Sequence, residues 1–460
     1  MKQGGLELVY IPKQMIIRKK RFSLLIAFLT VAAVVFAQHV GSNSPYSRYG
    51  YGLLSNPAFG ASEAMGGISY GLRRSQQVNP GNPASYSEID SLTFIFDMGV
   101  SGHLAHMDDG TNRRDFYNGN LDYIAIQFPL FRNVGAGIGL LPYSKMGYEY
   151  GASRSLPDSH YIEAYRGSGG LSRVFSGFAW EPIQNLSVGA NFSYLFGNFS
   201  RSSVVTPTSA SALVSETKYM YTIRDLKYDF GIQFTYPLGK SRELTFGAVY
   251  SPEIYTKADV NPSKMLYTGD PYQNPWLSPS QVLATDTLRK ANFQLPHTFG
   301  AGVTYRRGNL LVGLDGTYQL WKNTKYPDLL DDMAEKDRFN NSYRFNAGLE
   351  YVKDPMSPNF FHRIRFRGGV SYENSYTNFN INEPVSGKDV GMGTFSEYGV
   401  NVGVGLPFLD YMSGRTSMLN IGFGYTRQQP DADFMISQDM FKISINVNIN
   451  ELWFFKRQFN

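Results

Sequence analysis

The sequence of 460 residues contains no cysteine. This absence excludes disulfide bonds, thiol nucleophiles and thiolate-bound zinc. The six histidines form no His-x-x-x-His pair, so the common helical zinc motif is also missing. Residues 67–71 (GISYG) have the spacing of a serine-hydrolase elbow, but their Gly-rich surroundings offer neither the strand before it nor the helix after it that such an elbow needs. We therefore expect no enzymatic activity and no cofactor.

Long apolar runs are missing beyond the first part of the chain. Only residues 22–36 (FSLLIAFLTVAAVVF) form such a run, and they follow the basic cluster Arg18–Arg21. This layout is typical of a secretory signal peptide, and the small residue Ala37 is a suitable cleavage point. No later run reaches the ~20 residues that a membrane-spanning helix needs. We expect residues 1–37 to be a signal peptide and the mature chain to be exported.

An excess of charge of one sign is absent from the mature chain. The formal net charge is +5. The signal peptide accounts for all of it, with six basic residues and one acid: Lys2, Lys13, Arg18, Lys19, Lys20, Arg21 and Glu7. Because the remaining chain is neutral, no nucleic-acid partner is expected.

Aromatic residues and glycine are abundant, with 32 Tyr, 33 Phe and 46 Gly. Several segments alternate apolar residues with small or polar ones, most clearly 186–196, 310–320 and 441–450. Period-two alternation over about 10 residues is typical of a β-strand that faces lipid on one side and a polar lumen on the other. The sequence therefore predicts an all-β membrane protein.

Fourteen strands of this kind cover residues 92–460. We expect them at residues 92–104, 120–128, 133–148, 168–181, 186–201, 218–237, 242–256, 291–306, 308–321, 342–353, 361–375, 393–406, 417–428 and 438–452. Short and long connections alternate between them, as in outer-membrane barrels with short periplasmic turns. We predict a 14-stranded antiparallel transmembrane β-barrel in the cell outer membrane of a Gram-negative bacterium. A soluble β-sandwich is the alternative, but it would not need an apolar outer face on nearly every strand.

The segment before the barrel, residues 38–91, is rich in Gly, Pro, Asn and Ser. It repeats one tripeptide, at residues 56–58 and at Asn82-Pro83-Ala84. One interpretation is a disordered periplasmic tail, because this composition forms loops. The other is a plug inside the barrel, where irregular backbone is tolerated when protein surrounds it.

Short motifs resemble a known family. The series Met65, Gly66 and Gly67, followed by Asn82-Pro83-Ala84, is similar to the N-terminal hatch of the FadL-type long-chain fatty acid transporters. Residues 294–296 (QLP) and Trp321 are also similar to that family. The same barrel type includes the PorV-like proteins of type IX secretion in Bacteroidetes. Two further segments resemble Bacteroidetes outer-membrane proteins, residues 44–50 (SPYSRYG) and 453–457 (WFFKR).

The resemblance implies a plug and a lateral gap where one strand kinks. Pro142 lies within the third expected strand. Since proline cannot donate to a sheet ladder, it weakens pairing at that point. We expect a lateral gap near Gly139 and Pro142. The alternative is that Pro142 ends the strand at the outer rim.

Charged residues alternate along the expected strand 361–375. Arg363, Arg365 and Arg367 share its lumen face, and neighbouring strands add Arg344, Glu350 and Glu397. Two interpretations stay open. The arginines could hold a carboxylate or phosphate head group. They could instead form a structural network that fixes the plug, which we favour, with acidic partners among Asp97, Asp229 and Asp315.

Two functions fit this barrel, which outer-membrane lipid would surround. The first is passage of small hydrophobic molecules along apolar plug residues: Phe59, Met65, Ile68 and Tyr70. The second is a docking subunit of a complex for outer-membrane protein export or assembly. In that case the long connection 257–290, with Tyr267, Tyr272 and Trp276, would suit a partner interface, because aromatic residues dominate such contacts.

Overall fold

A computed structural model describes residues 43–452, apart from 111, 157–158, 210–211, 275, 286–287, 327–337, 383–388 and 411–414. The expected signal peptide, residues 1–37, lies outside the described residues. The aromatic segment 453–457 also lies outside them. No helix in the described part of the chain is long and apolar enough to cross a membrane.

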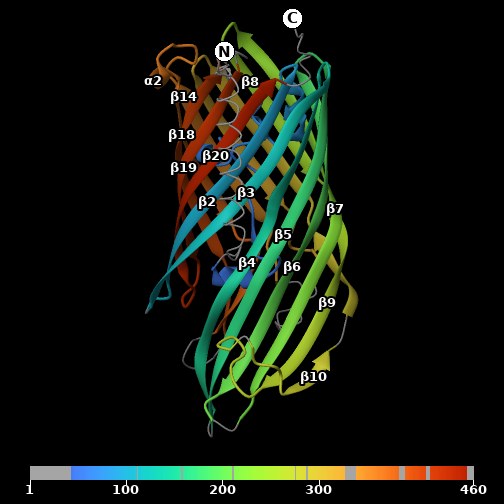
Figure 1. The fold of residues 1–460 in the computed structure, drawn as a ribbon, viewed down its shortest axis with the longest axis vertical. Coiled ribbons are helices and arrows are strands. Elements are labelled where there is room, and N and C mark those ends of the chain that lie inside the picture. Colours follow the sequence, from blue (N-terminus) through green and yellow to red (C-terminus); the bar gives the residue numbers. More distant parts are fainter. Residues whose placement is uncertain are drawn as a thin grey trace, which may run out of the picture.

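Fourteen strands form one closed ring (Figure 1). In ring order they are β2 (Thr93–Asp108), β3 (Arg113–Phe131), β4 (Val134–Leu156), β5 (Ser159–Ile183), β6 (Leu186–Pro207), β7 (Val214–Gly239), β8 (Arg242–Ser251), β12 (Thr298–Arg307), β13 (Leu310–Gln319), β14 (Ser342–Val352), β15 (Arg365–Asn374), β18 (Phe395–Asp410), β19 (Arg415–Pro430) and β20 (Ser437–Leu452). Each strand pairs antiparallel with the next, and β20 closes the ring by pairing with β2. The predicted 14-stranded antiparallel barrel is confirmed.

The alternation in the sequence becomes two faces of the barrel wall. On β20, Phe441, Ile443 and Ile445 are exposed on the outer face. The alternate residues of β20 point inward, and among them Asn446 and Asn448 are buried. An apolar outside and a polar inside are what a barrel in a lipid bilayer requires.

Short turns join the strands at the rim where the barrel begins, at Thr93, and ends, at Leu452. We call this the near rim. Three of its turns contain a residue in the left-handed region: Asn133 (φ 63°), Asn185 (φ 70°) and Gly308 (φ 55°). Asn and Gly tolerate this conformation best, so the turns are tight where the sequence predicted short connections.

The strands extend much further at the opposite rim, which we call the far rim. β4, β5, β6 and β7 are 23, 25, 22 and 26 residues long. Figure 1 shows their ends, with those of β9, reaching well beyond β2 and β3. The predicted long loops at 105–119, 149–167 and 202–217 are therefore largely strand. The sequence pattern missed these parts because they lack the regular apolar face of a lipid-exposed strand.

The expected loop 257–290 also contains strands. β9 (Ile254–Tyr267) pairs with the outer part of β7, and β10 (Gln281–Thr285) and β11 (Leu288–Leu295) pair with β9. The predicted strands 242–256 and 291–306 are interrupted at Pro252 and Pro296. A smaller hairpin, β16 (Phe379–Asn382) with β17 (Asp389–Gly393), occupies the connection 376–392.

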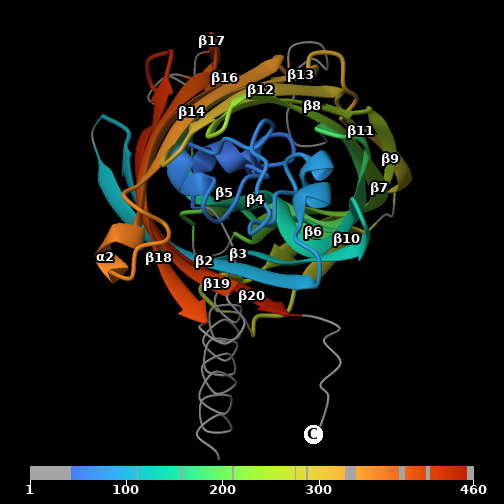
Figure 2. The ribbon, with the colours of Figure 1, turned by 90° about the horizontal axis from the view of Figure 1, so that it is seen from above.

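Residues 43–91 lie inside the ring (Figure 2). They form three short 3₁₀ helices and one two-residue strand, in the order η1 (Pro45–Arg48), β1 (Leu53–Leu54), η2 (Glu63–Met65) and η3 (Pro83–Glu88). Most of these residues are buried, and their polar groups bond to the inner wall. We call residues 43–91 the plug.

Candidate functional site

The Asn-Pro-Ala motif of the plug shapes a turn and ties it to the wall. The Asn82 side chain accepts a hydrogen bond from the backbone N–H of Ala84 (3.1 Å), which caps η3. Pro83 occupies the first position of this helix, where its missing N–H costs nothing. The Asn82 amide also donates to the carbonyls of Tyr70 (2.8 Å) and Ile232 (3.2 Å), so the motif joins two plug segments to β7.

Glycines let the plug backbone touch the wall backbone. Gly66 has φ 68°, and a Cβ there would lie 2.6 Å from the carbonyl oxygen of Val370. On the wall, a Cβ at Gly369 would lie 2.2 Å from the nitrogen of Gly66, and one at Gly348 would lie 2.1 Å from the oxygen of Met65. Any side chain at these positions would force the two backbones apart. The series at Met65, Gly66 and Gly67 therefore marks the place where the plug backbone packs directly on β14 and β15.

Asp315 of β13 holds the next part of the plug. Its carboxylate accepts the backbone N–H groups of Ser69 (2.5 Å) and Tyr70 (2.8 Å). The Tyr70 hydroxyl bonds to Thr317 (2.8 Å), and burial raises the pKa of Tyr70 to about 12, so the hydroxyl stays neutral. Ser69 is thus a buried plug residue in irregular backbone, without the strand and helix of a hydrolase elbow.

Three guanidinium groups converge on one carboxylate at the near-rim end of the plug. Glu350 of β14 accepts from Arg365 (2.7 Å) and Arg367 (2.7 Å) of β15 and from Arg74 of the plug (2.8 Å). Its side chain is only 3% exposed. Arg367 also donates to Asn420 of β19 (2.7 Å). Since Arg74 belongs to the plug and the other groups to the wall, this cluster, the Glu350 network, clamps the plug.

Two details of the arginine prediction were wrong. Arg363 lies in α2 (Phe360–Arg363), a helical turn at the near rim, and not on the strand. The turn forms because the Asn359 side chain accepts the backbone N–H of Phe361 (3.0 Å), which delays the start of β15 to Arg365.

The acidic partners of the arginines also differ from those expected. Asp315 holds the plug, and Asp97 accepts from Tyr123 (2.7 Å). Asp229 pairs with Arg173 (3.2 Å). Glu350 takes the arginines because it lies directly opposite Arg367 in the β14–β15 register.

Arg344 and Glu397 belong to a second polar group nearer the far rim. Arg344 pairs with Glu373 (2.5 Å), and Glu397 accepts from Gln428 (3.0 Å). They help to line a lumen cavity of about 330 Å³. Four further charged residues line it: Glu63, Asp122, Lys145 and Lys442. Within the described chain, no three His, Asp or Glu side chains are placed to hold a metal ion.

The barrel wall opens between β3 and β4. Their ladder runs from the near rim to the pair Ile124–Leu140 and ends there. Both strands nevertheless continue, β3 back to Arg113 and β4 on to Leu156. We call the space between these two stretches, where β3 and β4 do not pair with each other, the gap.

Irregularities on both strands explain the gap. In β3, Asp122 is an extra residue between the β2-paired residues Leu121 and Tyr123. In β4, the register with β5 shifts between Pro142 and Ser144. Bulges bend strands and end pairing, and Pro142 has no N–H to donate.

Pro142 lies in the stretch of β4 that borders the gap. Gly139 is still paired with Ala125, so the gap starts just beyond it. The alternative, that Pro142 ends its strand, was wrong, because β4 continues to Leu156.

The plug replaces part of the pairing that β4 loses in the gap. β1 pairs antiparallel with β4, Leu53 opposite Lys145 and Leu54 opposite Ser144. The backbone N–H of Ser55 donates to the carbonyl of Tyr143 (2.9 Å). The plug therefore acts as a short replacement strand on the β4 side of the gap.

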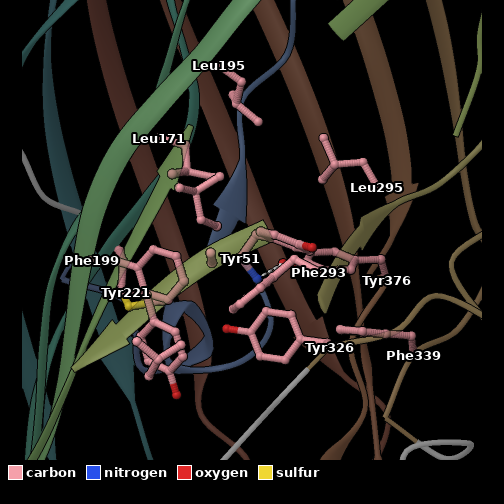
Figure 3. Close-up of a cluster of buried hydrophobic side chains, with 14 of the residues drawn as sticks. Tyr51, Leu171, Leu195, Phe199, Tyr221, Phe293, Leu295, Tyr326, Phe339 and Tyr376 are labelled. Atoms are coloured by element: carbon pink, nitrogen blue, oxygen red, sulfur yellow. Dashed lines mark hydrogen bonds between the residues drawn. The ribbon is translucent and has the colours of Figure 1, made fainter. Parts of the chain in front are cut away.

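A cluster of buried side chains, most of them aromatic, fills the lumen toward the far rim (Figure 3). Tyr51 of the plug packs edge-on against Tyr326 and lies 5.7 Å from Trp321, centroid to centroid. The other members come from β4, β5, β6, β7, β9 and β11 and from the connections after β13 and β15. We call it the aromatic cluster. Of the expected lining residues, Met65 and Ile68 are fully buried in plug–wall packing, whereas Phe59 lines the lumen cavity.

The aromatic residues of the connection 257–290 differ in accessibility. Tyr267 is buried, and its hydroxyl donates to Glu216 (3.2 Å). Tyr272 packs against the guanidinium of Arg166, which lies 4.1 Å from the ring centroid. Trp276 is 92% exposed at the far rim. Of the three, Trp276 is by far the most accessible to a partner.

Several solved structures share this architecture. The toluene transporter TodX of Pseudomonas putida matches with a TM-score of 0.55 and 15% identity, over 87% of this chain and 100% of that chain. The toluene transporter TbuX of Ralstonia pickettii matches with 0.53 and 13%, over 86% and 98%. A FadL homologue of Pseudomonas aeruginosa matches with 0.53 and 12%, over 86% and 99%. These similarities show a FadL-like fold, and none of the three proteins is an enzyme by its description.

The sequence comparisons are more specific. No curated protein matches the sequence. The model of one family, BamG, matches residues 15–460, which is nearly the whole chain. The narrower resemblance to PorV-like proteins of Bacteroidetes stays a prediction. The chain is a FadL-like outer-membrane barrel and belongs to the BamG family.

Proposed function

We propose that this protein is a docking subunit of an outer-membrane protein assembly complex and does not itself transport a solute. Membership of the BamG family favours association with the Bam assembly machinery. The FadL-like fold alone does not favour transport, because one fold hosts many functions. On this proposal the near rim faces the periplasm and the far rim faces the outside.

The observation that carries the proposal is the Glu350 network. A channel has to move or bypass its plug, but here Arg74 of the plug shares a buried carboxylate with two wall arginines. Breaking one partner out of a buried ion cluster leaves an uncompensated charge and is strongly unfavourable. The aromatic cluster, which includes Tyr51 of the plug, fills the lumen toward the far rim. Both features favour a closed lumen.

Passage of small hydrophobic molecules is the second candidate, and the gap favours it. A solute of this kind would leave the lumen sideways through the gap into the bilayer. However, the cavity behind the gap has charges of both signs, including Glu63, Lys145 and Lys442, beside apolar residues such as Phe59 and Leu141. Entry of an apolar solute would remove water from these charged groups, which is unfavourable.

Depletion of the protein from its own cells separates the two candidates. The docking function predicts lower levels of other folded β-barrels in the outer membrane and unchanged uptake of radiolabelled long-chain fatty acid. Complementation with Trp276→Ala tests whether the far rim contributes, and Tyr255→Ala, another exposed aromatic side chain, is the matched control. Loss of uptake with normal levels of other barrels would support transport and contradict the proposal.

A further inference from the structure

We propose that the unpaired edge of β3 in the gap is a docking site for one transmembrane β-strand of a partner outer-membrane protein. This inference rests on the proposed docking function and names the kind of partner that the gap accepts. The strand would lie beside Tyr117–Tyr123 and add to the barrel wall there.

The first step is the state of the β3 edge. One side of β3 pairs with β2 from Arg113 to Tyr123, apart from the extra residue Asp122. On the other side, no described residue pairs with the main chain of this stretch. A sheet edge with free N–H and C=O groups is a template for another strand.

The second step is the depth of this edge in the membrane. Tyr117 lies opposite Leu104 of β2, which lies opposite Phe441 of β20, and all three are on the lipid-facing side. One outward-facing pair further along, His106 and Asp115 form a polar contact (2.5 Å), which marks the end of the apolar band. The edge between Tyr117 and Tyr123 therefore lies at hydrocarbon depth, where unpaired main-chain groups are costly and open edges are avoided.

The third step is that the opposite edge of the gap already accepts a strand. β1 pairs with β4 at Leu53 and Leu54, in register and antiparallel. The gap thus already binds extended backbone on one side, through an element of only two residues. The β3 side has the same kind of edge and no such partner among the described residues.

The fourth step is the chemistry of the occupant. The cavity behind the gap is lined by polar residues from both sides: Asn118, Asn120 and Asp122 of β3 and Lys145 of β4. Lipid lies on the outer side. An occupant therefore needs polar groups facing inward, apolar groups facing outward and main-chain donors and acceptors along its length. A transmembrane β-strand has all three properties, whereas an acyl chain has only the apolar surface.

The test uses single cysteines in a protein that has none of its own. Leu121→Cys and Ile126→Cys both place a thiol on the outer face of β3, the first at the gap and the second where Ile126 pairs with Ile138 of β4. Each variant, in lipid nanodiscs, carries a benzophenone on the thiol. The probe is a synthetic peptide with the alternating sequence of residues 441–450 (FKISINVNIN), and the control peptide has the same composition without alternation.

We expect at least a tenfold higher crosslinking yield with the alternating peptide for the Leu121→Cys variant than for the Ile126→Cys variant, and no such preference with the control peptide. Equal yields for both variants would overturn the inference. A bimane on the same thiols tests the alternative occupant: if brominated lipid quenches it in the Leu121→Cys variant equally with and without peptide, lipid fills the gap and the strand site is wrong.

A separate measurement distinguishes this inference from the proposed function. The bimane-labelled Leu121→Cys protein is tested for co-purification with Bam components after reconstitution with an outer-membrane extract. Assembly with Bam components combined with no peptide binding would refute the strand site and leave the docking function standing. No assembly even for the wild-type chain would refute the docking function itself.

Discussion

Arg74 of the plug and Glu350 of β14 form a largely buried ion pair at 2.8 Å, 276 residues apart in the sequence. The same carboxylate binds Arg365 and Arg367, so three guanidinium groups share one carboxylate. The plug is therefore held by the wall through this shared carboxylate. This relationship leads to the first two predictions.

Glu350→Gln is expected to loosen the plug and destabilise the barrel by about 3–5 kcal/mol, because three guanidinium groups lose their shared charge in a buried site. The measurement is the free energy of unfolding in urea, followed by tryptophan fluorescence, with limited proteolysis of residues 43–91 as a second readout. The control is Glu243→Gln. It removes the carboxylate from the ion pair with Arg306, which is more exposed than the Glu350 network, and should cost about 0–1 kcal/mol. Equal effects of the two substitutions would contradict the clamp.

Arg365→Ala should have a smaller effect, about 1 kcal/mol, because Glu350 keeps Arg74 and Arg367 and the lost group is partly exposed. Its second readout is retention of negatively charged lipid by the purified protein, measured by mass spectrometry. If Arg365 is a structural residue, the Arg365→Ala variant retains as much negatively charged lipid as the wild type. A marked loss of bound lipid with unchanged stability would instead make Arg365 a ligand-binding residue.

Gly369→Val is expected to displace the plug, because even a Cβ at this position would lie 2.2 Å from the backbone of Gly66. Gly368→Val is a closely matched control one residue away, on the outer face, where the nearest atom to an added Cβ is 3.9 Å distant. We expect rapid cleavage of the plug by protease in the first variant and wild-type resistance in the second. Resistance in both variants would mean that the plug does not need this contact.

Trp321→Ala should open a cavity in the aromatic cluster and destabilise the protein by about 3–5 kcal/mol, since the side chain is fully buried. Single-channel conductance in a planar bilayer provides a second readout and should remain near zero, because the plug still closes the lumen. Trp276→Ala, at an exposed site, should change neither quantity. Ion conductance in the Trp321→Ala variant would show that the aromatic cluster is the main barrier.

The sequence predicted the wall of the barrel well because lipid imposes a pattern on every strand. Residues such as Phe441 and Ile443 must be apolar, and the residues between them face a polar lumen. Beyond the lipid this constraint ends, so the outer parts of β5 and β6 lack the pattern and looked like loops. Strand count followed from the lipid-facing part alone, whereas strand length did not.

The candidate site was only partly predictable. Alternation placed Arg365, Arg367 and Glu350 in the lumen. The third arginine, Arg74, lies in irregular backbone, where no sequence period indicates which way a side chain points. Pro142 signalled the gap, because a proline in a strand is visible in the sequence. The extra residue Asp122 on the facing strand could not be recognised in the sequence, because a bulge is defined only by the register of β3 with β2.

The most direct test of the central claim, that this barrel docks proteins and does not transport solutes, is native mass spectrometry after mild extraction from its own outer membrane. The account predicts a stoichiometric assembly with other outer-membrane proteins and no small hydrophobic molecule in the lumen. A single chain carrying a lipid-sized or smaller hydrophobic ligand would contradict it.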